Sequence, residues 1–237
     1  WNVMTLGRPA GEVLAAFAAL CRRAVAQVLR ILSDRARGQS SLPAGVPVLT
    51  FEGLRREVEA RDQGEAARVA ELARSVAARG LDLPEQCRLI TERCWAASGR
   101  SGPAVVVGFA SMPYLPTGLR DGEGRRLEAA ARAAARRVGE RHGTPIGFLG
   151  HFPGISDMSF LGQVGAASLP AIAANTPAWG HGIDWPAETP AALDVPAVNI
   201  GPWGRDFHMP LERLHTPYAF GVLPELLLET VREILRP

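Results

Sequence analysis

The segment Asn199–Arg213 holds the side chains best suited to chemistry, in the order Asn-Ile-Gly-Pro-Trp-Gly-Arg-Asp-Phe-His-Met-Pro-Leu-Glu-Arg. The apolar run Val195–Ile200 predicts a buried strand, and a glycine- and proline-rich turn then leads to His208. A neutral imidazole in a loop after a strand of an α/β sheet is a candidate metal ligand, which Glu212 could orient. Zinc sites in enzymes use three or more protein ligands, so the other ligands must lie elsewhere.

A second candidate segment is the irregular loop Gly150–Phe160, which contains Ser156 and Asp157. These two side chains could line a substrate cleft. They could equally cap a helix or close a turn, because Ser and Asp side chains accept hydrogen bonds from nearby backbone N–H groups. His208 likewise has a purely structural interpretation as a hydrogen-bonding residue.

The elements that must position these residues follow from hydrophobic periodicity and turn signals. We expect helices over Pro9–Arg35, through most of Glu52–Ser98, over Gly122–His142 and over Val222–Leu235. We expect strands at Trp1–Leu6, Val46–Phe51, Ala104–Ala110, Ile146–Leu149 and Val195–Ile200. The order after Gly122 (helix, strand, loop, strand, loop, helix) predicts half of a doubly wound α/β sheet. The break at Met112–Gly118 predicts two domains, residues 1–118 and 119–237.

Composition excludes several classes of function. The net charge is +2, and arginine carries the positive charge because the sequence contains no lysine, so we expect neither nucleic acid nor an anionic membrane as a partner. The three cysteines are widely spaced, which argues against a disulfide framework and favours the cytoplasm. No apolar run reaches the ~18 residues of a membrane span, and we expect no signal peptide. The sequence opens at Trp1 inside a predicted strand, which indicates part of a longer protein.

Two motifs resemble the C-terminal catalytic segment of the zinc aminoacylase, carboxypeptidase G and succinyl-diaminopimelate desuccinylase family. Gly154–Phe160 is similar to the G-T-S-D-G-R-F loop of that family. Gly201-Pro202, followed by His208 and Glu212, is similar to its G-P…H-x-x-x-E segment. Asn2–Thr5 before a long helix, Ile155–Phe160 and Asn199–Asp206 resemble the RocB-type arginine-utilisation proteins in particular.

The resemblance implies an α/β catalytic domain that binds two zinc ions (or cobalt or manganese) and a smaller α+β lid that often dimerises. Residues 1–118 would be the later part of the lid, and residues 119–237 the C-terminal half of the catalytic domain. The other metal ligands, and the glutamate that acts as general base, lie upstream of the lid in the family. This chain would therefore supply one metal ligand and no catalytic base.

The same resemblance assigns roles to individual residues. His208 matches the last zinc ligand of the family. The substrate-binding positions are Ser156, Asp157, Gly201, Gly204 and Arg205. Glu212 would shape the loop around His208 or pair with Arg213. Ser159 stands where family members that process amino acids carry an arginine, so Arg205 becomes the candidate that binds a substrate carboxylate.

Two functions remain open from the sequence. The chain could be the C-terminal portion of a dinuclear zinc hydrolase that cleaves an amide bond in a small peptide or N-acyl compound, with arginine catabolism as the pathway that the resemblance suggests. Alternatively, it could be a truncated, inactive protein that serves as a dimerisation or partner-binding module. In both cases we expect the chain alone to be inactive, and a homodimer through the lid is possible.

Overall fold

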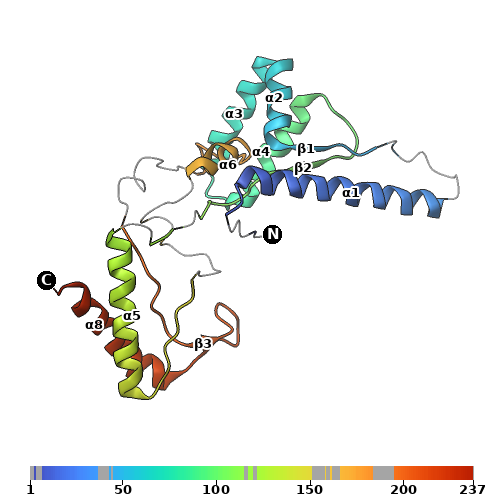
Figure 1. Ribbon diagram of the computed structural model, residues 1–237. Helices are drawn as coiled ribbons and strands as arrows, with labels where there is room; N and C mark the ends of the chain where they lie inside the picture. The colour runs from blue at the N-terminus through green and yellow to red at the C-terminus, as the bar shows by residue number, and fades with distance from the viewer. Residues whose placement is uncertain are drawn as a thin grey trace. The chain divides into compact units, whose positions relative to one another are not determined.

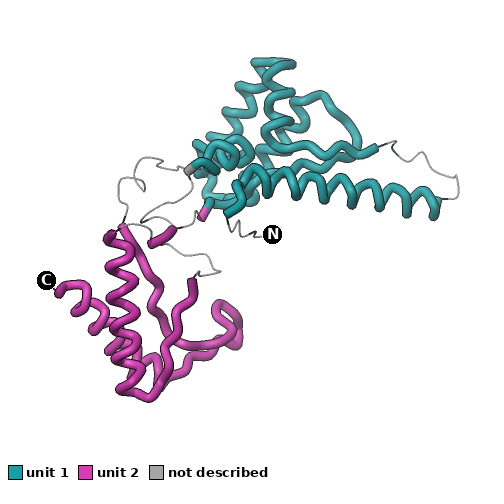
Figure 2. The backbone as a smooth tube through the Cα atoms, viewed as in Figure 1, with its two compact units in different colours: residues 1–113, 165–186 teal, residues 114–164, 187–237 magenta. Residues whose placement is uncertain are grey.

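The computed structural model describes residues 3, 7–36, 43, 45–114, 117–119, 122–150, 158, 161, 166–183 and 195–236. The chain forms two compact units (Figure 2): residues 1–113 with 165–186, and residues 114–164 with 187–237. The chain leaves unit 1 close to the predicted boundary at residue 118. Residues 165–186, which we had placed in the second domain, return to unit 1. The assignment of a lid and a catalytic domain stays a prediction.

Unit 1 consists of two short parallel strands between helices (Figure 1). Its elements are α1 (Ala10–Ala36), β1 (Val48–Thr50), α2 (Phe51–Arg61), α3 (Gln63–Ala77), α4 (Leu83–Ser98) and β2 (Val105–Val107). Helices α2–α4 connect the two strands, as parallel pairing requires a long crossover connection. The predicted long N-terminal helix, the helical region that follows it and both of these strands are confirmed, although the strands are shorter than expected.

The two strands separate two layers of apolar side chains. Val48 lies opposite Val105, and Leu49 lies opposite Val106. Val48 and Val105 pack with Leu14 and Ala18 of α1, whereas Leu49 and Val106 pack against the core of α2–α4. This alternation is the two-residue period of a strand that is covered on both faces.

The core of unit 1 lies between α2, α3 and α4. Its most deeply buried side chains include Leu54, Val58, Val76, Ile90 and Cys94. Local hydrogen bonds fix the helix ends, because the side chains of Thr50, Asp62 and Asp82 each accept hydrogen bonds from the first turn of the helix that follows.

The three cysteines are free thiols. Cys87 and Cys94 are buried, and burial raises the pKa of Cys94 to about 11. Both therefore act as small apolar side chains of the core, as their spacing on one helical face predicts.

Helix α6 (Leu169–Ala174) joins unit 1 from a distant part of the sequence. The next residue, Asn175, is buried and accepts a hydrogen bond from the backbone N–H of Glu52 at 3.1 Å. Its carbonyl oxygen accepts the backbone N–H of Phe109 at 2.8 Å. Asn175 thus links the start of α2 to the chain just beyond β2, which explains why residues 165–186 belong to this unit.

Unit 2 is built on two antiparallel helices, α5 (Gly122–His142) and α8 (Leu223–Ile234), both close to their predicted ranges. Their shared core consists of Ala134, Ala135, Val138, Val222 and Leu226. The alanines let the helices approach closely. Ion pairs border the contact: Arg137 with Glu229 and Glu233, and Arg141 and His142 with Glu225.

The predicted strands Ile146–Leu149 and Val195–Ile200 require a correction, because the structure assigns no strand to either segment. Ile146, Phe148 and Ile200 do pack against the core of α5 and α8. However, a strand needs a hydrogen-bonded neighbour, and backbone groups 146–149 and 196–200 have no backbone partner among the described residues. The architecture is compatible with an α/β fold, but the doubly wound sheet stays a prediction.

None of the described helices is both long and apolar enough to cross a membrane.

Candidate functional site

The predicted histidine segment forms a small hairpin in unit 2. Strands β3 (Gly204–Arg205) and β4 (Arg213–Leu214) pair antiparallel, with Gly204 opposite Leu214 and Arg205 opposite Arg213. Seven residues connect the strands, and His208 lies among them with its side chain exposed. The hairpin therefore presents the imidazole at the surface of the unit.

The backbone at the tip adopts a conformation that side chains disfavour. Asp206 has φ 57° and His208 has φ 60°, the only non-glycine residues with positive φ in the part of the chain that the structure describes. Such left-handed conformations cost free energy and persist where surrounding contacts impose them. They commonly occur at functional sites, which makes this tip a candidate on backbone geometry alone.

Three sets of contacts hold the tip in this conformation. The carbonyl oxygen of Asp206 accepts the backbone N–H of Met209 at 3.0 Å, and that of Met209 accepts the N–H of Glu212 at 3.0 Å. The Glu212 carboxylate accepts the backbone N–H of His208 at 3.2 Å. The Asp206 carboxylate pairs with the Arg213 guanidinium at 2.6 Å.

These contacts concern Glu212 and Arg213, whose roles at a metal site stay predictions. Glu212 shapes the loop by holding the His208 backbone, and Arg213 pairs with Asp206 instead. Sequence reasoning missed Asp206. An Asp seven residues before an Arg, across a turn, is too common a pattern to have identified this pair.

The base of the hairpin is fixed by Trp203 and His215. The backbone N–H of His215 donates to the carbonyl oxygen of Trp203 at 2.9 Å, and the two rings lie with centroids 4.4 Å apart. The backbone N–H of Tyr218 donates to Nδ1 of His215 at 3.4 Å, which connects the hairpin to the helical segment before α8. Burial raises the pKa of the Tyr218 phenol. Trp203 thus anchors the loop, although its side chain remains largely exposed.

Gly204 has a role in packing that Gly201 lacks. A Cβ atom on Gly204 would lie 2.5 Å from the carbonyl oxygen of Arg213 and 3.0 Å from the Phe207 ring, whereas a Cβ on Gly201 would meet nothing within 4 Å. Both glycines were predicted to contact substrate, and that role stays a prediction.

We expect Gly204→Ala to separate β3 from β4, because backbone atoms cannot yield as a flexible side chain can. Amide hydrogen exchange over residues 204–215 should accelerate by roughly tenfold or more, since local opening becomes easier. Gly201→Ala is the matched control and should leave these rates unchanged. Equal rates in the two variants would show that the close contact at Gly204 does not constrain the hairpin.

The hairpin exposes an unusual number of large apolar side chains. The exposed residues are Trp203, Phe207, Met209, Leu211 and Leu214. Exposed apolar patches of this density mark surfaces that contact another polypeptide or a ligand. The His208 imidazole thus lies within a surface suited to being covered.

Arg205 carries a charge that no ion pair within the described residues neutralises. It lies directly opposite Arg213 in the hairpin, and Arg213 is itself neutralised by Asp206. The guanidinium of Arg205 is exposed and can bind an anionic group such as a carboxylate. This is consistent with its predicted substrate role, which no contact in the structure tests.

The described residues do not form a complete metal site. No group of three or more His, Cys, Asp or Glu side chains among them is arranged to hold a metal ion. Asp206 and Glu212 are near His208, but both carboxylates already hold the loop. His208 can therefore offer one ligand, and the remaining ligands would have to come from other segments. Ser156 and Asp157 lie outside the described residues.

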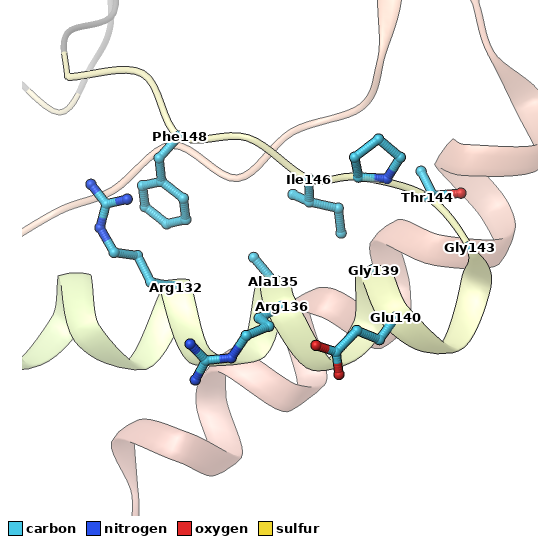
Figure 3. A pocket seen from close by; sticks show the side chains of 10 residues that line it. Arg132, Ala135, Arg136, Gly139, Glu140, Gly143, Thr144, Ile146 and Phe148 are labelled. Atoms are coloured by element: carbon cyan, nitrogen blue, oxygen red, sulfur yellow. The ribbon is translucent and has the colours of Figure 1, made fainter.

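A cavity of about 450 Å³ lies elsewhere in unit 2, between α5 and the segment that follows it (Figure 3). The Arg132 guanidinium lies over the Phe148 ring, 4.3 Å from its centroid (Figure 3). Ile146 and Ala135 form an apolar wall of the cavity. The cavity is wide open and contains none of the predicted site residues. Its described lining offers no metal ligand set, so we do not assign it a catalytic role.

Two curated proteins of Bacillus subtilis strain 168 are similar to this chain. The uncharacterized protein YqjN is 27% identical over 248 residues, which cover 100% of this chain and 44% of YqjN. Protein RocB is 29% identical over 160 residues, which cover 66% of this chain and 28% of RocB. The chain thus spans less than half the length of either relative. No protein-family model matches the chain, and no solved structure matches it. The distant homology to RocB supports the predicted resemblance in part.

Proposed function

We propose that this chain is the C-terminal portion of a dinuclear zinc-dependent amidohydrolase or peptidase. The observation that carries the proposal is the His208 hairpin, in which the Glu212 carboxylate accepts the backbone N–H of His208 and the exposed imidazole stands on a left-handed backbone. The similarity to RocB, and the family motifs around His208, support the same assignment.

In this proposal His208 supplies one metal ligand, and the rest of a longer polypeptide supplies the others and the general base. When bound, the zinc ions would polarise the substrate carbonyl and provide a nucleophilic water at neutral pH. Glu212 and the Asp206–Arg213 pair hold the backbone that aims His208. The exposed apolar side chains around His208 would be covered by the remainder of the catalytic domain, which would exclude water from the site.

The substrate would be a small peptide or an N-acyl compound, processed in the cytoplasm and connected with arginine use. The proposed link to arginine rests on the RocB resemblance. Arg205 is the residue of this chain that could bind a substrate carboxylate, because its guanidinium is exposed and no described carboxylate pairs with it. Zinc could be replaced by cobalt or manganese, since ligand type alone does not select the metal.

The test is to sequence the source gene on both sides of the codon for Trp1 and to purify its full product. We expect an in-frame H-x-D motif, a bridging aspartate and a Glu-Glu pair, and a product that contains about two zinc ions per chain and hydrolyses N-acyl amino acids or dipeptides. A full product without those residues, or without zinc, would overturn the proposal.

The second candidate function is an inactive dimerisation or partner-binding module, and helix α1 favours it. The C-terminal half of α1 extends away from the rest of unit 1 (Figure 1), and Val28, Ile31 and Leu32 are exposed along that half, as Leu20 is nearer the start of the helix. A helix with a free apolar stripe is marginal in water without a partner. A stable, zinc-free oligomer of the full product that loses its assembly on Val28→Glu substitution would favour this function over catalysis.

A further inference from the structure

The connection between β3 and β4 begins and ends with an acidic residue, and both carboxylates bond across it. Asp206 opens the connection, and its carboxylate pairs with the Arg213 guanidinium at 2.6 Å. Glu212 closes the connection, and its carboxylate accepts the backbone N–H of His208 at 3.2 Å. The first contact encloses the second along the chain, so both contacts span the tip that carries His208.

The contact between Glu212 and His208 has a conformational consequence. His208 has a left-handed backbone with φ 60°, which costs free energy and persists only where contacts impose it. Its backbone N–H donates to the Glu212 carboxylate. If that carboxylate turned to another partner, the backbone of His208 would be free to relax, and its imidazole would change direction.

Arg213 is the cation that could draw the Glu212 carboxylate away. It follows Glu212 directly in the sequence. Its guanidinium has five N–H donors, and in the structure it pairs with Asp206. Both side chains of that pair are substantially exposed, so the pair contributes little to the global stability of the chain. Its effect is therefore to be sought in the local conformation of the tip.

Arg205 makes the partner of Arg213 important. It lies directly opposite Arg213 in the hairpin, and like charges in opposite positions of two paired strands repel each other. The Asp206 carboxylate neutralises Arg213 and so permits this arrangement. Without it, Arg213 would need another anion, and the carboxylate nearest in sequence is that of Glu212.

We infer that Asp206 is a positioning residue of the candidate site, which acts on His208 through Arg213 and Glu212. By holding the Arg213 guanidinium, Asp206 leaves the Glu212 carboxylate available to the backbone of His208. The direction of the imidazole thus depends on a side chain that does not touch it. His208 is a metal ligand only under the proposed function, on which this role of Asp206 rests.

The first variant is Asp206→Asn in the full gene product, treated with a chelator so that no metal orders the tip. Asparagine keeps the size of the side chain and tolerates a positive φ, so the change removes the charge with little effect on the backbone preference. We expect amide exchange at His208 to accelerate by roughly fivefold or more, because Glu212 releases its N–H. Exchange in α5 and α8 should stay unchanged.

The decisive variant adds Arg213→Gln to Asp206→Asn. With the guanidinium absent, nothing competes for the Glu212 carboxylate, so exchange at His208 should return to within about twofold of the unchanged protein. A side chain that merely braced the hairpin by an ion pair would not be replaced by removing its partner as well. Glu128→Gln, which breaks an exposed ion pair with Arg132 on α5, is the control and should leave exchange at His208 unchanged.

Two results would overturn the inference. If Asp206→Asn leaves exchange at His208 as it was, the ion pair does not control the tip. If Asp206→Asn accelerates exchange, and the added Arg213→Gln fails to restore it, Asp206 does not act through Arg213. Faster exchange throughout α5 and α8 would likewise show that the effect is not confined to the hairpin.

Zinc binding separates this inference from the proposed function. In competition with a chelator, Asp206→Asn should weaken zinc binding by roughly tenfold, as expected for residues that orient a metal ligand, and the double variant should recover most of the loss. A product that binds no zinc in any form, but shows the expected exchange pattern, would refute the hydrolase proposal and leave the role of Asp206 in the hairpin intact. Zinc bound equally well by the three proteins would show that Asp206 does not position the ligand.

Discussion

Replacing His208 with alanine in the full gene product is expected to reduce kcat by more than about a thousandfold and to lower the bound zinc. The reason is geometric. The imidazole is the side chain of this hairpin that is free to bind a metal, since the neighbouring carboxylates of Asp206 and Glu212 already hold the loop. In the proposed zinc site, its loss would remove one of at least three protein ligands.

The fold should survive this change, because the His208 side chain is exposed and the contacts of the loop run through its backbone N–H. Circular dichroism and the hydrogen exchange of α5 and α8 should therefore match the unchanged protein. His181→Ala is the control, an exposed histidine of unit 1. Retained turnover and full zinc content in the His208 variant would remove the role that we give to this residue.

The sequence predicted the helices well because their signals are local. Gly122–His142 was expected as a helix and is one to the residue, since its alanines and arginines repeat with helical spacing. The predicted strand Ile146–Leu149 was wrong because a strand is determined by contacts with another segment and not by local signals alone. Its residues are apolar and pack on the core, but a strand depends on a neighbour, and no described segment pairs with it.

The candidate site likewise has features that the sequence indicates and features that it does not. The pattern of residues alone indicated His208 and Glu212, because a histidine followed by a carboxylate after a glycine-rich turn suits a metal site. The left-handed backbone at Asp206 and His208 was not predicted from the sequence: Asp and His adopt φ > 0 more often than most residues, but only a small fraction of them do so. The return of Asn175 to unit 1 was missed as well, since its partners are 66 and more residues away.

The second prediction with a large effect concerns the stability of unit 1. Leu54→Ala should lower the free energy of unfolding of that unit by about 3 kcal/mol, because the side chain is completely buried among α2–α4 and its removal leaves a cavity. In thermal unfolding this corresponds to a loss of about 10 °C in the midpoint. Leu20→Ala makes the same chemical change at a leucine of α1 that is 50% exposed, and it should cost less than about 0.5 kcal/mol.

Leu54→Ala also tests whether the two units unfold separately. The buried clusters around Leu54 and around Val138 share no residue, so the loss of stability in one need not reach the other. Amide exchange should accelerate in α2, α3 and α4 and stay unchanged in α5 and α8. If all five helices lose protection together, the chain is one cooperative unit, and the His208 hairpin depends on the core of unit 1 for its stability. If only the first three respond, the hairpin and α8 form a module whose candidate site can be studied without unit 1.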